Sequence, residues 1–153
     1  MCRGLKSLDI HSFIKEVTGS FQYTCQRLQN ADESEYLNLF QVVLTMARQN
    51  VSIASPEGCN MCVQTEKTNF LMEFKVNSTA EEALTQTERY RKNFHDKDRE
   101  VLCMGINYQF TKAVRTCQHH QDQLLCNWMA SLYSENGTLK KNYRAQKLVL
   151  TCA

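Results

Sequence analysis

The chain has 153 residues, of which 42 % are hydrophobic and 22 % are charged. This length suits one domain with a normal core, and the composition argues against disordered or collagen-like chains. Eighteen Lys and Arg residues against 16 Asp and Glu residues leave a net charge of +2, too small a bias to gather nucleic acid. We therefore expect a single domain over residues 1–153 and neither nucleic-acid binding nor membrane insertion.

Cysteine is the most informative residue type, because eight is an even and unusually high number for this length. Thiols at this density form disulfide frameworks in oxidising compartments. We favour a clasp between Cys2 and Cys152, since the two termini of a domain often lie close together, and a bridge between Cys117 and Cys126 across a short corner. The pairing of the remaining four stays open. The full set predicted to be paired is Cys2, Cys25, Cys59, Cys62, Cys103, Cys117, Cys126 and Cys152.

The cysteines also predict where the protein works. The first residues contain no run of 7–15 apolar side chains that would form the core of a signal peptide. We therefore expect the mature part of a secreted precursor, located outside the cell. Three Asn-x-Ser/Thr sequons, at Asn50, Asn77 and Asn136, are places where a secreted glycoprotein would carry glycan.

The scarcity of one proline and five glycines favours long helices over many strands joined by tight turns. Apolar residues at three- and four-residue steps from Ile10 to Leu28 predict a first helix, capped by Ser7 or Asp9. Asp32 and Glu35 form a predicted capping box ahead of a second helix over residues 33–47. Residues 50–58 are predicted to be a loop.

The second half is also predicted to be helical. Phe70, Leu71 and Phe74 fit a helix, although Phe70, Met72, Phe74 and Val76 alternate like a strand, and we predict the helix. A capping box, Ser78 with Glu81 or Thr79 with Glu82, starts a helix over residues 80–94. Further helices are predicted over residues 102–117 and 124–132, and a weak one over residues 139–150. The predicted fold is an all-α, disulfide-stapled bundle of five or six helices.

No catalytic or metal-binding pattern is complete. The Cys59-Asn-Met-Cys62 motif has neither the strand and helix context of a redox dithiol nor a second ligand pair for zinc. The four histidines are His11, His95, His119 and His120, and the signatures of secreted ribonucleases and phospholipases A2 are absent. We therefore predict a protein that is not an enzyme and that has no cofactor and no metal.

The spacing Cys103-x13-Cys117-x8-Cys126-Asn127-Trp128, with Tyr108 and Phe110 inside the first interval, resembles the C-terminal part of a cysteine-rich helical secreted domain family abundant in nematodes. The resemblance covers about a third of the sequence. It implies an extracellular α-helical domain.

These observations predict a secreted, non-catalytic recognition protein, that is, an extracellular ligand or modulator of a protein partner. The predicted contact residues are Tyr90, Arg91, Arg89 and Lys92, because Tyr and Arg are enriched where partners bind and no sequon lies between residues 80 and 120. The alternative is an extracellular carrier of a small apolar ligand. Its helical-bundle cavity would be lined by residues such as Met46, Phe70, Phe74 and Met129.

Overall fold

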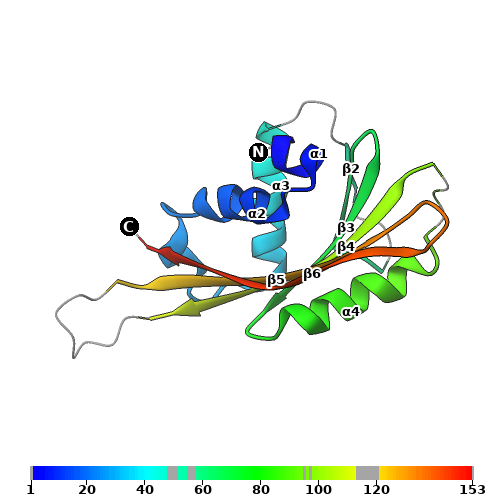
Figure 1. Cartoon of the computed structure of the whole chain (residues 1–153). Coiled ribbons are helices and arrows are strands. Elements are labelled where there is room, and N and C mark those ends of the chain that lie inside the picture. The colour runs from blue at the N-terminus through cyan, green and yellow to red at the C-terminus, as the bar shows by residue number, and fades with distance from the viewer. Residues whose placement is uncertain are drawn as a thin grey trace.

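The computed structural model describes residues 2–47, 52–54, 58–94, 96, 98–112 and 121–152. These residues form a six-stranded sheet whose strands lie side by side in sequence order (Figure 1). All neighbouring strands are antiparallel except β3 and β4, which are parallel. The strands are β1 (Ser52–Ala54), β2 (Met61–Gln64), β3 (Thr68–Val76), β4 (Glu100–Thr111), β5 (Gln123–Tyr133) and β6 (Leu139–Thr151).

Helices cover both faces of this sheet. Helix α4 (Ala80–Arg91) connects the parallel strands β3 and β4 and lies on one face, and the other helices lie on the opposite face (Figure 1). These are α1 (Cys2–Ser7), α2 (Ile10–Gly19), the 3-10 helix η1 (Cys25–Leu28) and α3 (Glu33–Met46). The prediction of an all-α helical bundle is therefore wrong, and the fold is mixed α/β.

The helix starts predicted from capping residues are confirmed. The Asp9 side chain accepts a hydrogen bond from the Ser12 N–H at the start of α2. Asp32 and Glu35 form the expected capping box of α3, and Thr79 caps α4. The first helix is shorter than predicted, because α2 ends at Gly19 and only the separate 3-10 turn η1 follows.

Four predicted helices are strands instead. The segment after Cys59 forms β2 and β3, and the helices predicted over residues 124–132 and 139–150 fall on β5 and β6. Residues 102–111 of the helix predicted over residues 102–117 fall on β4, and residues 113–117 lie outside the described residues. In the helices predicted over residues 102–117 and 124–132, apolar residues recur every four positions, for example Leu102, Ile106 and Phe110. Four is an even number, so residues at this spacing also share one face of a strand. The helical fold implied by the nematode family resemblance is wrong for the same residues.

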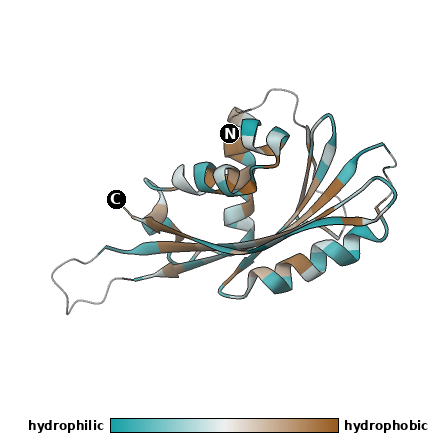
Figure 2. Cartoon of the chain, in the orientation of Figure 1, coloured by the Kyte–Doolittle hydropathy of each residue, from teal (hydrophilic) through white to brown (hydrophobic). Residues whose placement is uncertain are grey.

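The larger core lies between the sheet and helices α1, α2 and α3. Aromatic rings meet there, for example Phe13 with Phe40 and Phe40 with Phe74, at centroid distances of 5.9 and 4.9 Å. Figure 2 shows hydrophobic residues both on the strands and on the helices that cover them.

A smaller core lies between the sheet and α4, and Gly105 makes it possible. A Cβ at this position would lie 2.2 Å from the Ala80 carbonyl oxygen and 2.2 Å from the Leu84 nitrogen, so only glycine lets α4 lie this close to β4. The buried residues of this core are Cys59, Cys62, Leu71, Leu84, Val101 and Cys103.

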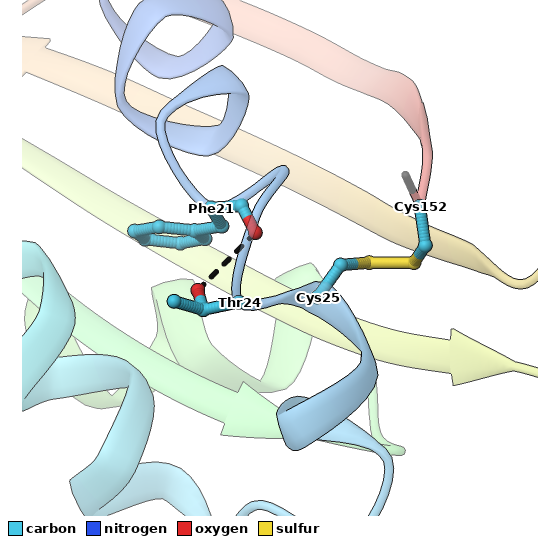
Figure 3. The surroundings of a disulfide bond; sticks show 4 residues. All are labelled: Phe21, Thr24, Cys25 and Cys152. Atoms are coloured by element: carbon cyan, nitrogen blue, oxygen red, sulfur yellow. Dashed lines mark hydrogen bonds between the residues drawn. A yellow bond between two sulfur atoms is a disulfide. The ribbon is translucent and has the colours of Figure 1, made fainter.

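One disulfide joins described residues, between Cys25 at the start of η1 and Cys152 just after β6 (Figure 3). The predicted Cys2–Cys152 clasp is therefore wrong. Cys126 is a free thiol, so the predicted Cys117–Cys126 bridge is wrong as well. Cys59, Cys62 and Cys103 are also free and buried, which contradicts full pairing. Cys117 and the Cys2 thiol lie outside the described part of the structure.

Candidate functional site at the end of helix α4

A surface pocket of about 510 Å³ lies where the C-terminal end of α4 meets the hairpin between β5 and β6. Two of the four predicted contact residues, Arg91 and Lys92, line it. Among the described residues, the lining consists of Arg91, Lys92, Phe94, Asp96, Glu135, Asn136 and Gly137.

Arg91 is the best-defined cation of this pocket. Its guanidinium carbon lies 3.7 Å from the centroid of the Tyr133 ring, within the range of a cation–π contact. Its Nε is buried and has no hydrogen-bond partner among the described residues. Its Nη1 points toward Gly137, 3.9 Å from where a Cβ would stand on that glycine. The Tyr133 ring therefore positions the guanidinium at the hairpin without using its hydrogen-bond donors.

The stacking surface is itself fixed by a hydrogen bond. The Tyr133 hydroxyl donates to Glu88 Oε1 of α4 at 2.9 Å. Burial and the neighbouring Glu88 carboxylate raise the pKa of Tyr133 to about 12, so its hydroxyl keeps the donated proton at neutral pH. Tyr133 therefore joins β5 to α4 and orients Arg91 at the same time.

Tyr90 and Arg89 have different surroundings. The Tyr90 ring is half-buried, 5.9 Å from the Phe94 ring between centroids, and Gly58 leaves space for it. Phe94 lines the pocket, so Tyr90 supports the pocket wall from behind. Arg89 is exposed and lies outside the pocket lining, whereas Lys92 is exposed within it.

Asp96, one of the two acidic residues in the described lining, already has hydrogen-bond partners. Its Oδ2 accepts hydrogen bonds from Asn69 Nδ2 at 2.8 Å and from Arg99 Nη1 at 3.0 Å. These bonds, led by the one from Asn69, lower the pKa of the Asp96 carboxyl. Arg99 compensates the charge of Asp96, and Glu135 is a second carboxylate in the lining. Arg91 and Lys92 therefore leave the described lining with an excess of one positive charge, which favours anionic groups.

The fold brings one sequon to this pocket. Asn136 is exposed on the β5–β6 hairpin and lines the pocket with Arg91, although 45 positions separate the two in the sequence. A glycan on Asn136 would therefore stand beside the predicted contact residues, which sequence distance alone did not indicate. Asn77 is exposed in the turn before α4, at the other end of that helix, and Asn50 lies outside the described residues.

Sequence reasoning missed Tyr133 and the hairpin. Residues 124–132 were predicted to be a helix closed by Gly137, so Tyr133 was not considered as a partner of α4. Gly137 does adopt a positive φ of 86°, but it does so in a hairpin turn. The pair Asn136 and Gly137 between two apolar runs is the signal that indicates such a hairpin.

A second group of polar side chains lies in the larger core. The Thr18 and Tyr108 hydroxyls are 3.1 Å apart, and the Tyr36 ring stacks on the Tyr108 ring at 4.6 Å between centroids. The Tyr36 hydroxyl and the Trp128 Nε1–H are buried and have no hydrogen-bond partner among the described residues.

The residues suggested for a carrier cavity do not come together. Phe70 and Phe74 are buried in the larger core, whereas Met46 is 84 % exposed and Met129 packs against the smaller core on the other face of the sheet. The helical-bundle cavity predicted from the sequence is therefore wrong in its architecture.

The free cysteines are poor candidates for chemistry. Burial raises the pKa of Cys59 to about 12 and that of Cys62 to about 11, so both thiols of the Cys59-Asn-Met-Cys62 motif stay protonated. Within the described ranges, no three His, Cys, Asp or Glu residues are grouped so that they would hold a metal ion. His11 is exposed near the Trp128 ring, and the other three histidines lie outside those ranges.

No protein-family model, curated protein or solved structure matches this protein. None of the helices in the described part of the molecule has the length and apolar character needed to cross a membrane.

Proposed function

We propose that this protein is a secreted, non-catalytic recognition protein that binds a protein partner at the pocket between α4 and the β5–β6 hairpin. One observation carries the proposal: the Arg91 guanidinium is stacked on Tyr133, and it forms no ion pair with another described residue. Arg and Tyr are the residue types that most often dominate the energy of protein interfaces.

The pocket favours a carboxylate from the partner. An Arg side chain that is already oriented presents planar donors that match a carboxylate and loses little freedom on binding. Lys92 adds a second cation, and Phe94 supplies an apolar wall. We therefore expect an Asp or Glu side chain of the partner, or the carboxylate at the partner's C-terminus, to occupy the pocket.

The extracellular location is part of this proposal. The Cys25–Cys152 disulfide supports it, because such bonds persist in oxidising compartments. The exposed position of Asn77, at the other end of α4, is compatible with glycan there, whereas a glycan on Asn136 would stand in the pocket and compete with the partner.

The test compares capture of extracellular proteins by the wild-type protein, Arg91→Ala and the matched control Arg27→Ala, which removes an exposed cation on η1. We expect one partner to bind wild type and control equally and to bind Arg91→Ala at least tenfold more weakly, about 1.4 kcal/mol. Arg91→Lys keeps the charge but loses the planar donors, so it should also bind weakly. Equal capture by all variants, or no partner at all, would refute the proposal.

The unpartnered donors of Tyr36 and Trp128 favour a second candidate function, an extracellular carrier of a small apolar ligand. A ligand with a hydrogen-bond acceptor would satisfy these buried groups, which otherwise cost free energy. Native mass spectrometry of the purified protein would then show a bound molecule, and the variant with both Tyr36→Phe and Trp128→Phe would no longer carry it. A spectrum of the bare protein alone would reject this candidate.

A further inference from the structure

Strand β6 forms one edge of the sheet and is 13 residues long. It pairs with β5 on one side, and no described strand pairs with it on the other (Figure 1). Every second backbone N–H and C=O of an edge strand points outward and can pair with another extended segment. In β6 this alternation is interrupted next to Lys140 and at residues 144–145, where the register with β5 shifts. Most residues of β6 are exposed, although α2 contacts part of the strand.

The edge is strongly basic. β6 carries Lys140, Lys141, Arg144 and Lys147, and no acidic residue lies between positions 139 and 151. Lys140 forms an ion pair with Glu100, which lies at the start of β4. The Lys141 Nζ lies 4.5 Å from the centroid of the Tyr143 ring, and neither Arg144 nor Lys147 forms an ion pair with a described residue.

The cations are distributed on both faces of the sheet. Lys141 lies opposite Leu132, on the face covered by α1, α2 and α3, and Lys147 lies opposite Asn127, on the face covered by α4. A nucleic acid or a membrane resting on one face would contact only part of this set. An extended segment that pairs with β6 would lie in the plane of the sheet. Its side chains would point to both faces, so they could contact the cations of both faces.

A second copy of this protein is a poor occupant. Antiparallel pairing of two β6 edges would bring two sets of basic residues together without one acidic residue in either strand. Like charges opposite one another destabilise paired strands.

We propose that the β6 edge binds an extended acidic segment of another protein, which adds to the sheet as a further strand. Main-chain hydrogen bonds to β6 would supply affinity, and carboxylates on both faces of the added strand would reach Lys141, Arg144 and Lys147. Val149 and Leu139, which are 53 % and 48 % exposed, offer apolar contacts near the two ends of β6. This edge is distinct from the Arg91 pocket, and the inference does not rest on the function proposed for that pocket.

The test measures the fluorescence anisotropy of a labelled peptide as long as β6 with a Glu-Glu-Val-Val repeat, which places Glu side chains on both faces of the added strand. A second peptide has the same side chains but is N-methylated at every third residue, which removes amide donors from both of its edges. We expect the first peptide to bind at least tenfold more tightly than the second. We also expect the exchange of β6 amide hydrogens to slow when the first peptide is bound.

Two protein variants with equal net charge complete the test. The first combines Lys141→Glu, Arg144→Glu and Lys147→Glu on the edge, and the control combines Lys6→Glu, Arg27→Glu and Lys67→Glu at exposed positions on α1, η1 and the β2–β3 turn. We expect the edge variant to bind the first peptide at least tenfold more weakly than wild type, and the control to stay within about twofold. Arg91→Ala should bind it like wild type, which separates this inference from the proposed pocket.

Circular dichroism verifies that both variants fold. If the edge variant misfolds, the single change Lys147→Glu replaces it, and we expect this variant to bind the first peptide threefold more weakly than wild type. Equal binding of both peptides would show attraction by charge alone and would overturn the proposal. The proposal also fails if the edge variant keeps peptide binding but self-associates, because the basic residues would then serve only to keep copies of the protein apart.

Discussion

The substitution Gly105→Ala tests the packing on which the surface pocket depends. Gly105 lies in the middle of β4, directly under the first turn of α4. An added Cβ would stand 2.2 Å from the Ala80 carbonyl oxygen and 2.2 Å from the Leu84 nitrogen, whereas ordinary contacts begin at 3.4 Å. Both atoms belong to the helix backbone, so no side-chain rotation relieves the overlap.

The size of the expected destabilisation follows from this overlap. Helix α4 must move away by about 1 Å, which loosens the contacts of Ala83 and Leu84, buried side chains that are 0 and 9 % exposed. Overpacking of a core usually costs about 1–3 kcal/mol, and a clash with backbone atoms belongs at the upper end. We therefore expect a loss of about 3 kcal/mol in the free energy of unfolding, and a melting temperature lower by about 6–12 °C for a protein of this size.

Urea denaturation followed by circular dichroism measures the effect, and Gly19→Ala is the matched control. Gly19 ends α2, and no atom lies within 4 Å of a Cβ placed there. Its replacement should change the unfolding free energy by less than about 1 kcal/mol and in the stabilising direction, since alanine is the better helix former. If Gly105→Ala is as stable as Gly19→Ala, the close contact between α4 and β4 does not exist and the geometry of the Arg91 pocket is wrong.

Two further predictions concern the cysteines. The disulfide joins positions 127 residues apart, so it closes a long loop and restricts the unfolded chain. Replacing Cys25 and Cys152 by Ser should therefore lower the free energy of unfolding by about 4–5 kcal/mol. A loss below about 1 kcal/mol in urea denaturation would contradict this reasoning. The free thiols of Cys59, Cys103 and Cys126 ionise near pH 9 when unfolded, but burial raises each pKa to about 12 in the folded protein. The contribution of these three thiols to the free energy of unfolding should therefore be constant below pH 9 and fall between pH 9 and pH 12. An unfolding free energy that is the same at pH 10.5 as at pH 8 would show that these thiols are not buried.

The helix starts were predictable because capping is a local interaction. Asp9, Asp32 and Thr79 each accept a hydrogen bond from a backbone N–H three residues further along the sequence. Such a bond depends on a few neighbouring residues and not on the rest of the fold. Sequence spacing alone was therefore enough to find the start of α3 and to reduce the starts of α2 and α4 to two candidates each.

The strands were not predictable from the same spacing. Residues 101–108 of β4 are buried on both faces, because helices cover the sheet above and below, so the strand lacks the alternation of a half-exposed one. In β5, the positions Leu124, Trp128 and Leu132 are four apart and fit either structure. The scarcity of glycine and proline strengthened the wrong choice, although the pair Asn136 and Gly137 indicated a hairpin.

Two of the four predicted contact residues, Arg91 and Lys92, line the pocket, and their contact with a partner stays a prediction. What the sequence could not show is that Tyr133 would supply the surface on which Arg91 stacks, because that contact joins residues 42 positions apart on different elements. The same limit applies to Asn136. Long-range contacts of this kind depend on the order of the strands in the sheet. Because the segments of β4 and β5 were predicted to be helices, this order could not be predicted.

The two ends of β6 are fixed independently of any partner, which bears on how the edge would bind an added strand. At its start, the Ser134 N–H donates to the Thr138 carbonyl in the hairpin at 2.8 Å. At its end, the Cys152 N–H donates to the Asp122 carbonyl at 2.8 Å, and the disulfide ties Cys152 to Cys25 of η1. Because the strand is held extended between these anchors, an incoming segment would order only itself and not β6. Preorganisation of this kind lowers the entropy cost of association, so even a short acidic strand gains most of the free energy of its main-chain hydrogen bonds.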